Sequence, residues 1–103
     1  MRIQIVSDAW LPQINGVVRT LDTGRSELHA MGHDVAVLGP DRFRTLPCPT
    51  YPEIRLALLP DRKLTQHIDA FAPDAIHIAT EGPLGLSARG YCLKRKLPFT
   101  TSY

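Results

Sequence analysis

The sequence predicts an α/β fold with a doubly wound parallel sheet, and two observations support this prediction. Short apolar runs rich in β-branched residues alternate along the chain with longer amphipathic stretches of helical period. Several of these runs are apolar at successive positions, which is typical of parallel strands that are covered on both faces. Because such sheets bind ligands at the carboxyl ends of their strands, the residues that follow each strand are the first candidates for a functional site.

Length and composition limit the classes of protein to consider. The 103 residues are enough for one small domain, and the hydrophobic fraction of 44% is typical of a globular protein. The net charge of +2 is too small to favour a nucleic-acid partner. Cys48 and Cys92 lack a C-x-x-C spacing, so we expect free thiols in a reducing compartment. No run approaches the ~18 apolar residues of a membrane span, and the chain begins directly with a strand, so we expect no signal peptide and a cytoplasmic location.

A βαβ unit is expected at the start of the chain. The run Arg2–Val6 predicts a strand, and a helix is expected from about Gly16 to Met31, ended by Gly32 as a C′ residue. His33–Gly39 predicts a second strand that is covered on both faces. Gly24 falls on the buried stripe of the helix and suggests a close contact between helix and sheet. The predicted members of this stripe are Val17, Leu21, Leu28 and Met31.

Five prolines interrupt the stretch from Pro40 to Pro60. We expect an ordered irregular loop over Asp41–Thr50 and one short strand within Glu53–Leu59. A helix over Arg62–Ala72 is predicted to follow, with Asp61 as its N-cap. Its predicted buried residues are Leu64, Ile68 and Phe71.

The last third of the chain repeats the alternation of strand and helix. Asp74–Ala79 predicts a buried strand, and a helix is expected from Pro83 to about Lys96, because proline suits the first helical position. The segment from Pro98 to Ser102 begins one more strand. Together these elements predict a Rossmann-like doubly wound sheet.

Two loops follow strands whose carboxyl ends should meet at the switch point of this sheet, namely Ser7–Gly16 and Thr80–Pro83. Gly16 stands where the first loop enters a helix, and the lack of a Cβ there lets a ligand approach the backbone closely. The first N–H groups of that helix lack partners and carry the positive end of the helix dipole. Such a terminus readily binds an anion such as a diphosphate.

A simpler interpretation of the first loop stays open. Asp8 and the pair Asn15–Gly16 then only form turns, and Trp10 is only a hydrophobic residue at the rim. The full G-x-G-x-x-G fingerprint of a dinucleotide site is absent, so the strand–glycine–helix pattern does not decide between the two interpretations.

Other polar residues give weaker indications. Glu81 precedes a helix, where a carboxylate that complements the dipole is favoured over a ligand. His77 lies inside a buried strand, and a hydrogen-bonded core histidine is favoured over a functional one. The remaining histidines form no metal set with the cysteines, so no metal site is expected. The basic run Lys94–Lys96 could contact anionic lipid, although a solvated helix end is the favoured interpretation.

Four blocks of sequence resemble one known family. The opening block Asp8-Ala9-Trp10-x-Pro12-Gln13-x-Asn15-Gly16-Val17-Val18-Arg19-Thr20-Leu21 resembles the start of a family-four retaining glycosyltransferase with the GT-B fold. Leu28–Val35 resembles the family's passage L-x-x-x-G-H-[ED]-V, and Pro73–Gly85 its second site loop. Pro98–Tyr103 resembles the strand after that loop. The chain is most similar to lipid mannosyltransferases dependent on GDP-mannose, and to their sulfoquinovosyl- and glucosyl-transferring cousins.

The resemblance implies transfer of a hexosyl group, first of all mannosyl, from a nucleotide sugar to a lipid or saccharide hydroxyl with retention. No bound cofactor or metal is implied, and contact with the cytoplasmic face of the membrane would be peripheral. Gly16 would contact the donor diphosphate, with Asn15 shaping the loop. Four residues would border the acceptor side of the cleft, namely Asp8, Trp10, Gln13 and Glu81.

The resemblance also implies that residues 1–103 are an incomplete N-terminal lobe. In this family a histidine that faces the reaction centre follows the Thr-Ser-Tyr segment, whereas Tyr103 is the last residue here. The family's second domain, which carries the nucleotide pocket, is not part of this sequence. Two other hypotheses therefore stay open. One is a non-catalytic half-domain that pairs with a separate chain, and the other is a small nucleotide-binding α/β module.

Overall fold

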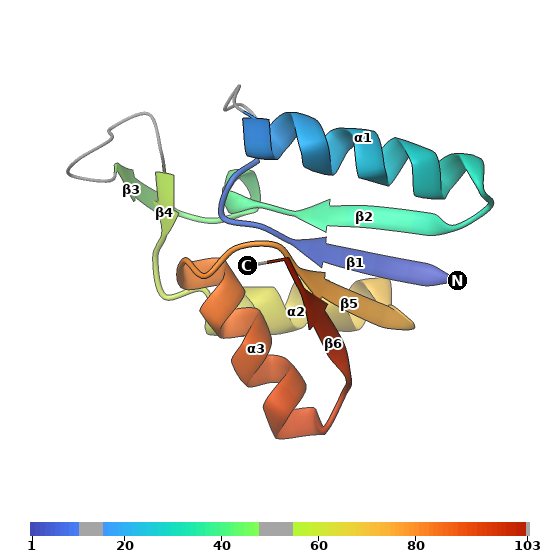
Figure 1. Cartoon of the computed structure of the whole chain (residues 1–103). Coiled ribbons are helices and arrows are strands. Elements are labelled where there is room, and N and C mark those ends of the chain that lie inside the picture. The colour runs from blue at the N-terminus through green and yellow to red at the C-terminus, as the bar shows by residue number, and fades with distance from the viewer. Residues whose placement is uncertain (11–15, 48–54, 103) are drawn as a thin grey trace.

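The main sheet of the molecule has four parallel strands. A computed structural model of the chain describes residues 1–10, 16–47 and 55–102. The strands are β1 (Arg2–Val6), β2 (Asp34–Leu38), β5 (Ala75–Ile78) and β6 (Phe99–Thr101), in the spatial order β2–β1–β5–β6. All three pairings are parallel, and β1 lies between β2 and β5 (Figure 1). The predicted central position of the first strand is confirmed.

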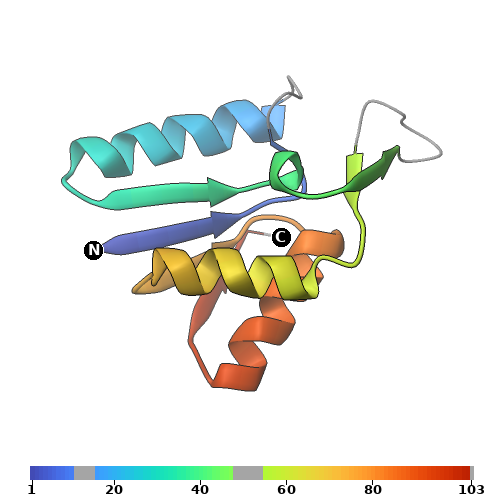
Figure 2. The same cartoon turned by 180° about the vertical axis from the view of Figure 1, so that it is seen from behind.

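Three helices cover the two faces of this sheet. They are α1 (Gly16–Ala30), α2 (Asp61–Phe71) and α3 (Pro83–Arg95). Helix α1 lies against one face over β1 and β2, whereas α2 and α3 cover the opposite face (Figures 1 and 2). The chain moves outward from β1 to β2 and then returns to the other side of β1 for β5. The doubly wound fold is therefore confirmed, and its switch point lies between β1 and β5.

The fully buried core lies between the sheet and the pair α2 and α3. Apolar side chains from both layers interlock there, including Leu64 and Ile68 of α2 and Ile76 and Ile78 of β5. Cys92 of α3 belongs to the same cluster, and burial raises the pKa of its free thiol. The predicted buried stripe of α2 is confirmed at Leu64 and Ile68.

The contact of α1 with the sheet is looser than the sequence predicts. Met31 is 71% exposed beyond the end of α1, whereas Val18 is only 5% exposed, so the predicted stripe is wrong at Met31 and omits Val18. No atom of another described strand or helix lies within 4 Å of an ideal Cβ on Gly24, so the predicted close contact with the sheet is wrong too. The reason is that α1 covers the edge strand β2, in which only Leu38 is fully buried.

A small second sheet follows the main strand β2. After a 3₁₀ turn over Pro40–Arg42, strand β3 (Thr45–Pro47) pairs antiparallel with β4 (Arg55–Ala57). The predicted irregular loop is therefore wrong at Thr45–Pro47, while the predicted short strand within residues 53–59 is confirmed. Figures 1 and 2 show this second sheet beyond the carboxyl ends of β1 and β2.

Helix α2 begins one residue earlier than predicted. Asp61 is its first residue rather than its N-cap, and Pro60 occupies the N-cap position without a side-chain hydrogen bond. The Asp61 carboxylate instead accepts a hydrogen bond from the Ser87 hydroxyl of α3 at 2.5 Å. The residue thus ties the start of α2 to the neighbouring helix.

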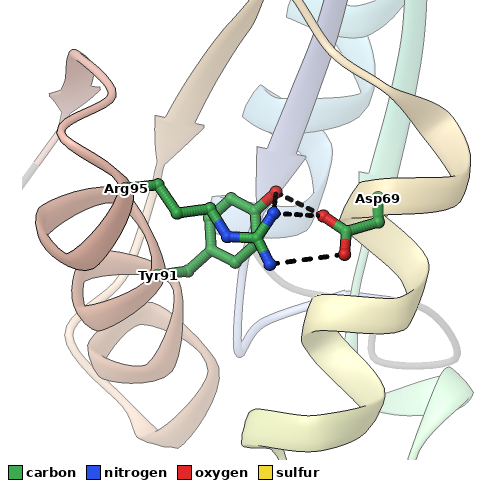
Figure 3. A network of polar contacts seen from close by, with 3 residues as sticks. All are labelled: Asp69, Tyr91 and Arg95. Atoms are coloured by element: carbon green, nitrogen blue, oxygen red, sulfur yellow. Dashed lines mark hydrogen bonds and ion pairs between the residues drawn. The ribbon is translucent and has the colours of Figure 1, made fainter.

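A polar cluster joins α2 and α3 farther along their length (Figure 3). The Tyr91 hydroxyl and the Arg95 guanidinium both donate to Asp69 Oδ1 at 2.7 Å. The guanidinium also lies over the Tyr91 ring, 4.4 Å from its centre. The hydrogen bond from Tyr91 lowers the pKa of Asp69, and burial and then the Asp69 carboxylate raise that of Tyr91. The cluster is half-exposed, so its contribution to stability is modest.

Candidate functional site

The loops that follow β1 and β5 are hydrogen-bonded to each other at the carboxyl edge of the sheet. The Asp8 backbone N–H donates to the Thr80 hydroxyl oxygen at 2.8 Å. The Thr80 hydroxyl in turn donates to Asp8 Oδ2 at 2.7 Å. The predicted side-by-side arrangement of the two loops across the switch point is confirmed.

Asp8 also caps helix α3 from across the sheet. Its Oδ1 accepts the Leu84 N–H at 2.7 Å, and its Oδ2 accepts the Gly85 N–H at 3.2 Å. Gly82 holds the N-cap position of α3 and offers no side chain of its own for this task. A carboxylate supplied from the loop after β1 therefore satisfies the free donors and the positive end of the dipole.

We call the hydrogen bonds that join Asp8 to Thr80 and to the start of α3 the clamp. Two glycines make room for it. A Cβ on Gly82 would overlap the Asp8 carboxylate, and a Cβ on Gly85 would overlap the backbone carbonyl of Thr80. Neither glycine has a positive φ. Glycine is therefore required at these positions because a side chain would not fit, and not because of the backbone conformation. This role of Thr80, Gly82 and Gly85 was not predicted from the sequence. The signal that could have revealed it is a Gly-Pro helix start without a capping side chain, together with an aspartate two residues after the end of a neighbouring strand.

Trp10 is buried rather than placed at an open rim. It is 8% exposed, and a Cβ on Gly39 would come within 2.6 Å of the Trp10 Cβ. The indole therefore packs on the backbone that follows β2. Ser7 shapes the start of the same loop, because its hydroxyl donates to the Ala9 carbonyl at 2.7 Å and accepts the Ala9 N–H at 3.1 Å.

The N-terminus of α1 differs from those of the other two α-helices in its local charge. Its first turn contains no acidic residue, and the preceding stretch of sequence, residues 11–15, contains none either. Helix α2 starts at Asp61 and α3 is capped by Asp8. Among the described residues, nothing lies within 4 Å of an ideal Cβ on the exposed Gly16. No acidic side chain of this turn would therefore repel an anion near the start of α1.

The other predicted site residues are placed as follows. Glu81 is exposed in the loop between β5 and α3, and its carboxylate has no hydrogen bond or ion pair within the described parts of the chain. Gln13 and Asn15 lie outside the described residues. The assignment of Asp8, Trp10 and Glu81 to the acceptor side of a cleft stays a prediction.

His77 is a hydrogen-bonded histidine of the sheet. Its Nδ1 lies 2.7 Å from the Thr100 hydroxyl oxygen and its Nε2 lies 3.1 Å from that of Ser102. Burial lowers the pKa of His77, which favours the neutral ring. The hydrogen bonding expected from the sequence is confirmed, and the preference for a structural over a functional role stays a prediction. Over residues 1–10, 16–47 and 55–102, no three His, Cys, Asp or Glu side chains group closely enough to hold a metal ion.

Comparison with known proteins gives a family match over most of the chain. The family model described as "Glycosyltransferase Family 4" matches residues 14–103. A "GDP-mannose-dependent alpha-mannosyltransferase" of Mycobacterium tuberculosis is 26% identical over 102 residues, covering 82% of this chain and 27% of that protein. An "Alpha-monoglucosyldiacylglycerol synthase" of Acholeplasma laidlawii is 30% identical over 113 residues, covering 95% of this chain and 28% of that protein.

A mannosyltransferase of the same description from Corynebacterium glutamicum is 26% identical and covers the whole of this chain. The chain spans just over a quarter of the length of these curated relatives, 27–29%. No solved structure gives a significant match. In the described part of the chain, no helix has the length and apolar character needed to cross a membrane.

Proposed function

Because the chain belongs to glycosyltransferase family 4, we propose that it forms the N-terminal part of an enzyme that transfers a hexosyl group from a nucleotide sugar to a lipid or saccharide hydroxyl. The parallel sheet with helices on both faces is the architecture of a GT-B lobe. The two kinds of relative carry mannosyl and glucosyl names, so mannose from GDP-mannose is the first donor to test.

The observation that carries the proposal is the contrast between the two helix termini at the switch point. Asp8 occupies the α3 terminus, with both carboxylate oxygens engaged by α3 N–H groups. No acidic residue from the chain occupies the first turn of α1, and Gly16 is exposed there. A diphosphate at this edge of the sheet is therefore attracted to α1 and repelled from the Asp8 carboxylate. The proposed contact of Gly16 with the donor follows from this contrast.

The same geometry suits the chemistry of glycosyl transfer. Negative charge develops on the leaving diphosphate as the glycosidic bond breaks, and fixed N–H donors stabilise that charge in the transition state. The hydrogen bonds of Asp8 fix the residues directly after β1 relative to the loop after β5 and the start of α3. We propose that transfer proceeds with retention at the anomeric carbon and without a bound metal.

The test uses the longest expressed form of the protein that contains these residues. It is incubated with GDP-mannose and other nucleoside-diphosphate sugars, with diacylglycerol or a simple mannoside as acceptor. The expected result is a glycosylated product whose NMR spectrum shows the anomeric configuration of the donor. An inverted product would overturn the proposed stereochemistry. Tight nucleotide binding without transfer to any acceptor would favour a nucleotide-binding module instead.

A further inference from the structure

Helix α3 is apolar on two opposite faces. Its inner face packs on the core through three fully buried residues, namely Leu84, Ala88 and Cys92. On its outer face, Leu86 is 60% exposed and Leu93, two turns later, is 61% exposed. Because positions three and four apart lie on one side of a helix, Gly90 falls in the same row between the two leucines. We call Leu86, Gly90 and Leu93 the outer row of α3.

The other two α-helices have no such row. Among the side chains that the structure describes in α1 and α2, no large apolar residue is exposed. A helix that covers a sheet needs one apolar face, and its outer face is ordinarily polar. Packing on the sheet therefore does not account for the outer row of α3. Apolar residues on both sides are typical of a helix that is covered on both sides.

Gly90 is not required by the fold. It is exposed, its φ is not positive, and no described atom beyond its own turn of helix lies within 4 Å of an ideal Cβ. Glycine inside a helix is also less stable than alanine. Gly85 on the same helix differs, since a Cβ there would overlap the Thr80 carbonyl. A glycine between two exposed leucines allows another backbone to approach α3 closely.

Two cations flank the outer row. Arg89 and Lys94 are exposed, one on each side of the row, and neither forms an ion pair with any residue that the structure describes. The sequence of α3 contains no acidic residue. A partner whose apolar side chains are flanked by carboxylates therefore complements this face. A second copy of α3 would instead bring like charges together.

A hollow of about 850 Å³ adjoins the outer row between α2 and α3. Leu86, Gly90 and Lys94 line it on the α3 side, and Pro60 and Thr65 line it on the α2 side. A helix laid along α3 would extend side chains into this hollow, as amphipathic helices do when they bind in grooves. A lipid bilayer would give no reason for the glycine, since a larger apolar residue would enter lipid more favourably.

We propose that the outer row of α3 binds an amphipathic helix of another protein, one that carries acidic residues on both sides of its apolar face. The apolar side chains of this helix contact Leu86 and Leu93, and its backbone comes closest at Gly90. Its carboxylates pair with Arg89 and Lys94. The inference is independent of the proposed function, because it uses no residue of the candidate site.

The experiment measures the binding of a synthetic helical peptide by fluorescence anisotropy. The probe has leucine and alanine on one side and glutamate on both flanks, and the control peptide has lysine in place of every glutamate. The longest expressed form of the protein should bind the acidic peptide about tenfold more tightly than the basic peptide, or better. The double variant R89E/K94E should reverse this preference.

Single substitutions in the row test the contact itself. Leu93→Gln should weaken binding of the acidic peptide about tenfold, because it removes apolar contact area. Gly90→Ala should weaken binding roughly five- to tenfold, because the new methyl group holds the peptide away from α3. The same substitution should raise the melting temperature by a few degrees, since alanine favours the helix. A residue with only a structural role would not combine higher stability with weaker binding.

Matched controls change equivalent groups elsewhere. Met31→Gln replaces another exposed apolar side chain, and Gly24→Ala replaces a glycine of α1 that lies among polar residues. Both should change peptide binding less than twofold. The inference is overturned if the acidic peptide does not bind, because the polypeptide itself or a second copy would then cover the row. It is also overturned if both peptides bind alike, or if Gly90→Ala binds as tightly as the wild type.

Discussion

The clamp between the two loops predicts a large loss of stability for Asp8→Ala. Asp8 is 8% exposed, and its carboxylate accepts hydrogen bonds from two N–H groups and one hydroxyl. Alanine removes all of these acceptors at once. It also leaves the positive end of the α3 dipole without a counter-charge.

The magnitude follows from the burial of the donors. An N-cap that water can replace costs about 1 kcal/mol when it is lost. Leu84 and Gly85 are buried, however, and an unsatisfied buried donor costs about 1–3 kcal/mol. A water molecule that enters the space would accept a hydrogen bond from one of these N–H groups and so reduce the loss. We therefore expect Asp8→Ala to lower the free energy of unfolding by about 2–4 kcal/mol, a large fraction of the ~5–15 kcal/mol of a typical domain.

Urea unfolding measures this loss directly, with the fluorescence of Trp10 as the probe. Trp10 is the single tryptophan, and it is buried two residues after Asp8. The matched control is Asp74→Ala, which removes a carboxylate that accepts one backbone hydrogen bond from Arg2 at the exposed, opposite end of the sheet. The control should cost about 1 kcal/mol or less. Equal losses in the two variants would refute the reasoning. A fully stable Asp8→Ala protein with impaired transfer would instead place Asp8 in the acceptor cleft.

Three further predictions concern individual side chains elsewhere in the fold. Gly85→Ala should cost about 3 kcal/mol, because the new Cβ overlaps the fixed carbonyl of Thr80 and neither side can move freely; a urea midpoint equal to wild type would contradict this. The lowered pKa values of His77 and His67 mean that folding favours their neutral rings. Stability present at neutral pH should therefore fall as pH drops below their ordinary value of 6.5, and a flat melting temperature between about pH 7.5 and pH 5.5 would exclude this linkage. Tyr91→Phe should lower the melting temperature by only a few degrees, since its hydroxyl donates to an exposed carboxylate; a loss as large as that for Gly85→Ala would show that the contact is not peripheral.

The elements that the sequence predicts well are those with strong local patterns. β1, α2, β5 and α3 lie within a residue or two of their predicted bounds, because runs of β-branched residues, helical periodicity and proline mark them locally. Strand β3 was not predicted, since its three residues end in proline and it is a strand only through pairing with β4. The exposure of Met31 depends on how far α1 extends over an edge strand, and the periodicity of the sequence carries no information about that distance.

In the candidate site too, some features could be predicted from the sequence, while others depend on contacts between distant residues. The meeting of the two loops followed from strand order alone, because parallel strands bring their carboxyl ends to one edge. The partner of Asp8 was not predicted, since Leu84 lies 76 positions away and the bond exists only after the sheet has formed. Likewise, Gly39 was predicted only as the end of a strand and Trp10 as a rim or cleft residue, and only their contact in space explains the glycine.

The most direct test of the account compares two glycines of the same helix. Gly16→Val places a side chain at the N-terminus of α1, where none of the described residues lies within 4 Å of the new Cβ and where the proposed diphosphate would lie. Gly24→Val, the control, adds the same side chain farther along α1, also into open space. Donor affinity is measured by titration calorimetry with the nucleotide sugar on the longest expressed form. Loss of one charge-assisted hydrogen bond of about 1.5–3 kcal/mol predicts roughly ten- to a hundredfold weaker binding for Gly16→Val alone. Unchanged affinity in a folded Gly16→Val protein would contradict the account and leave Gly16 as a helix-start residue only.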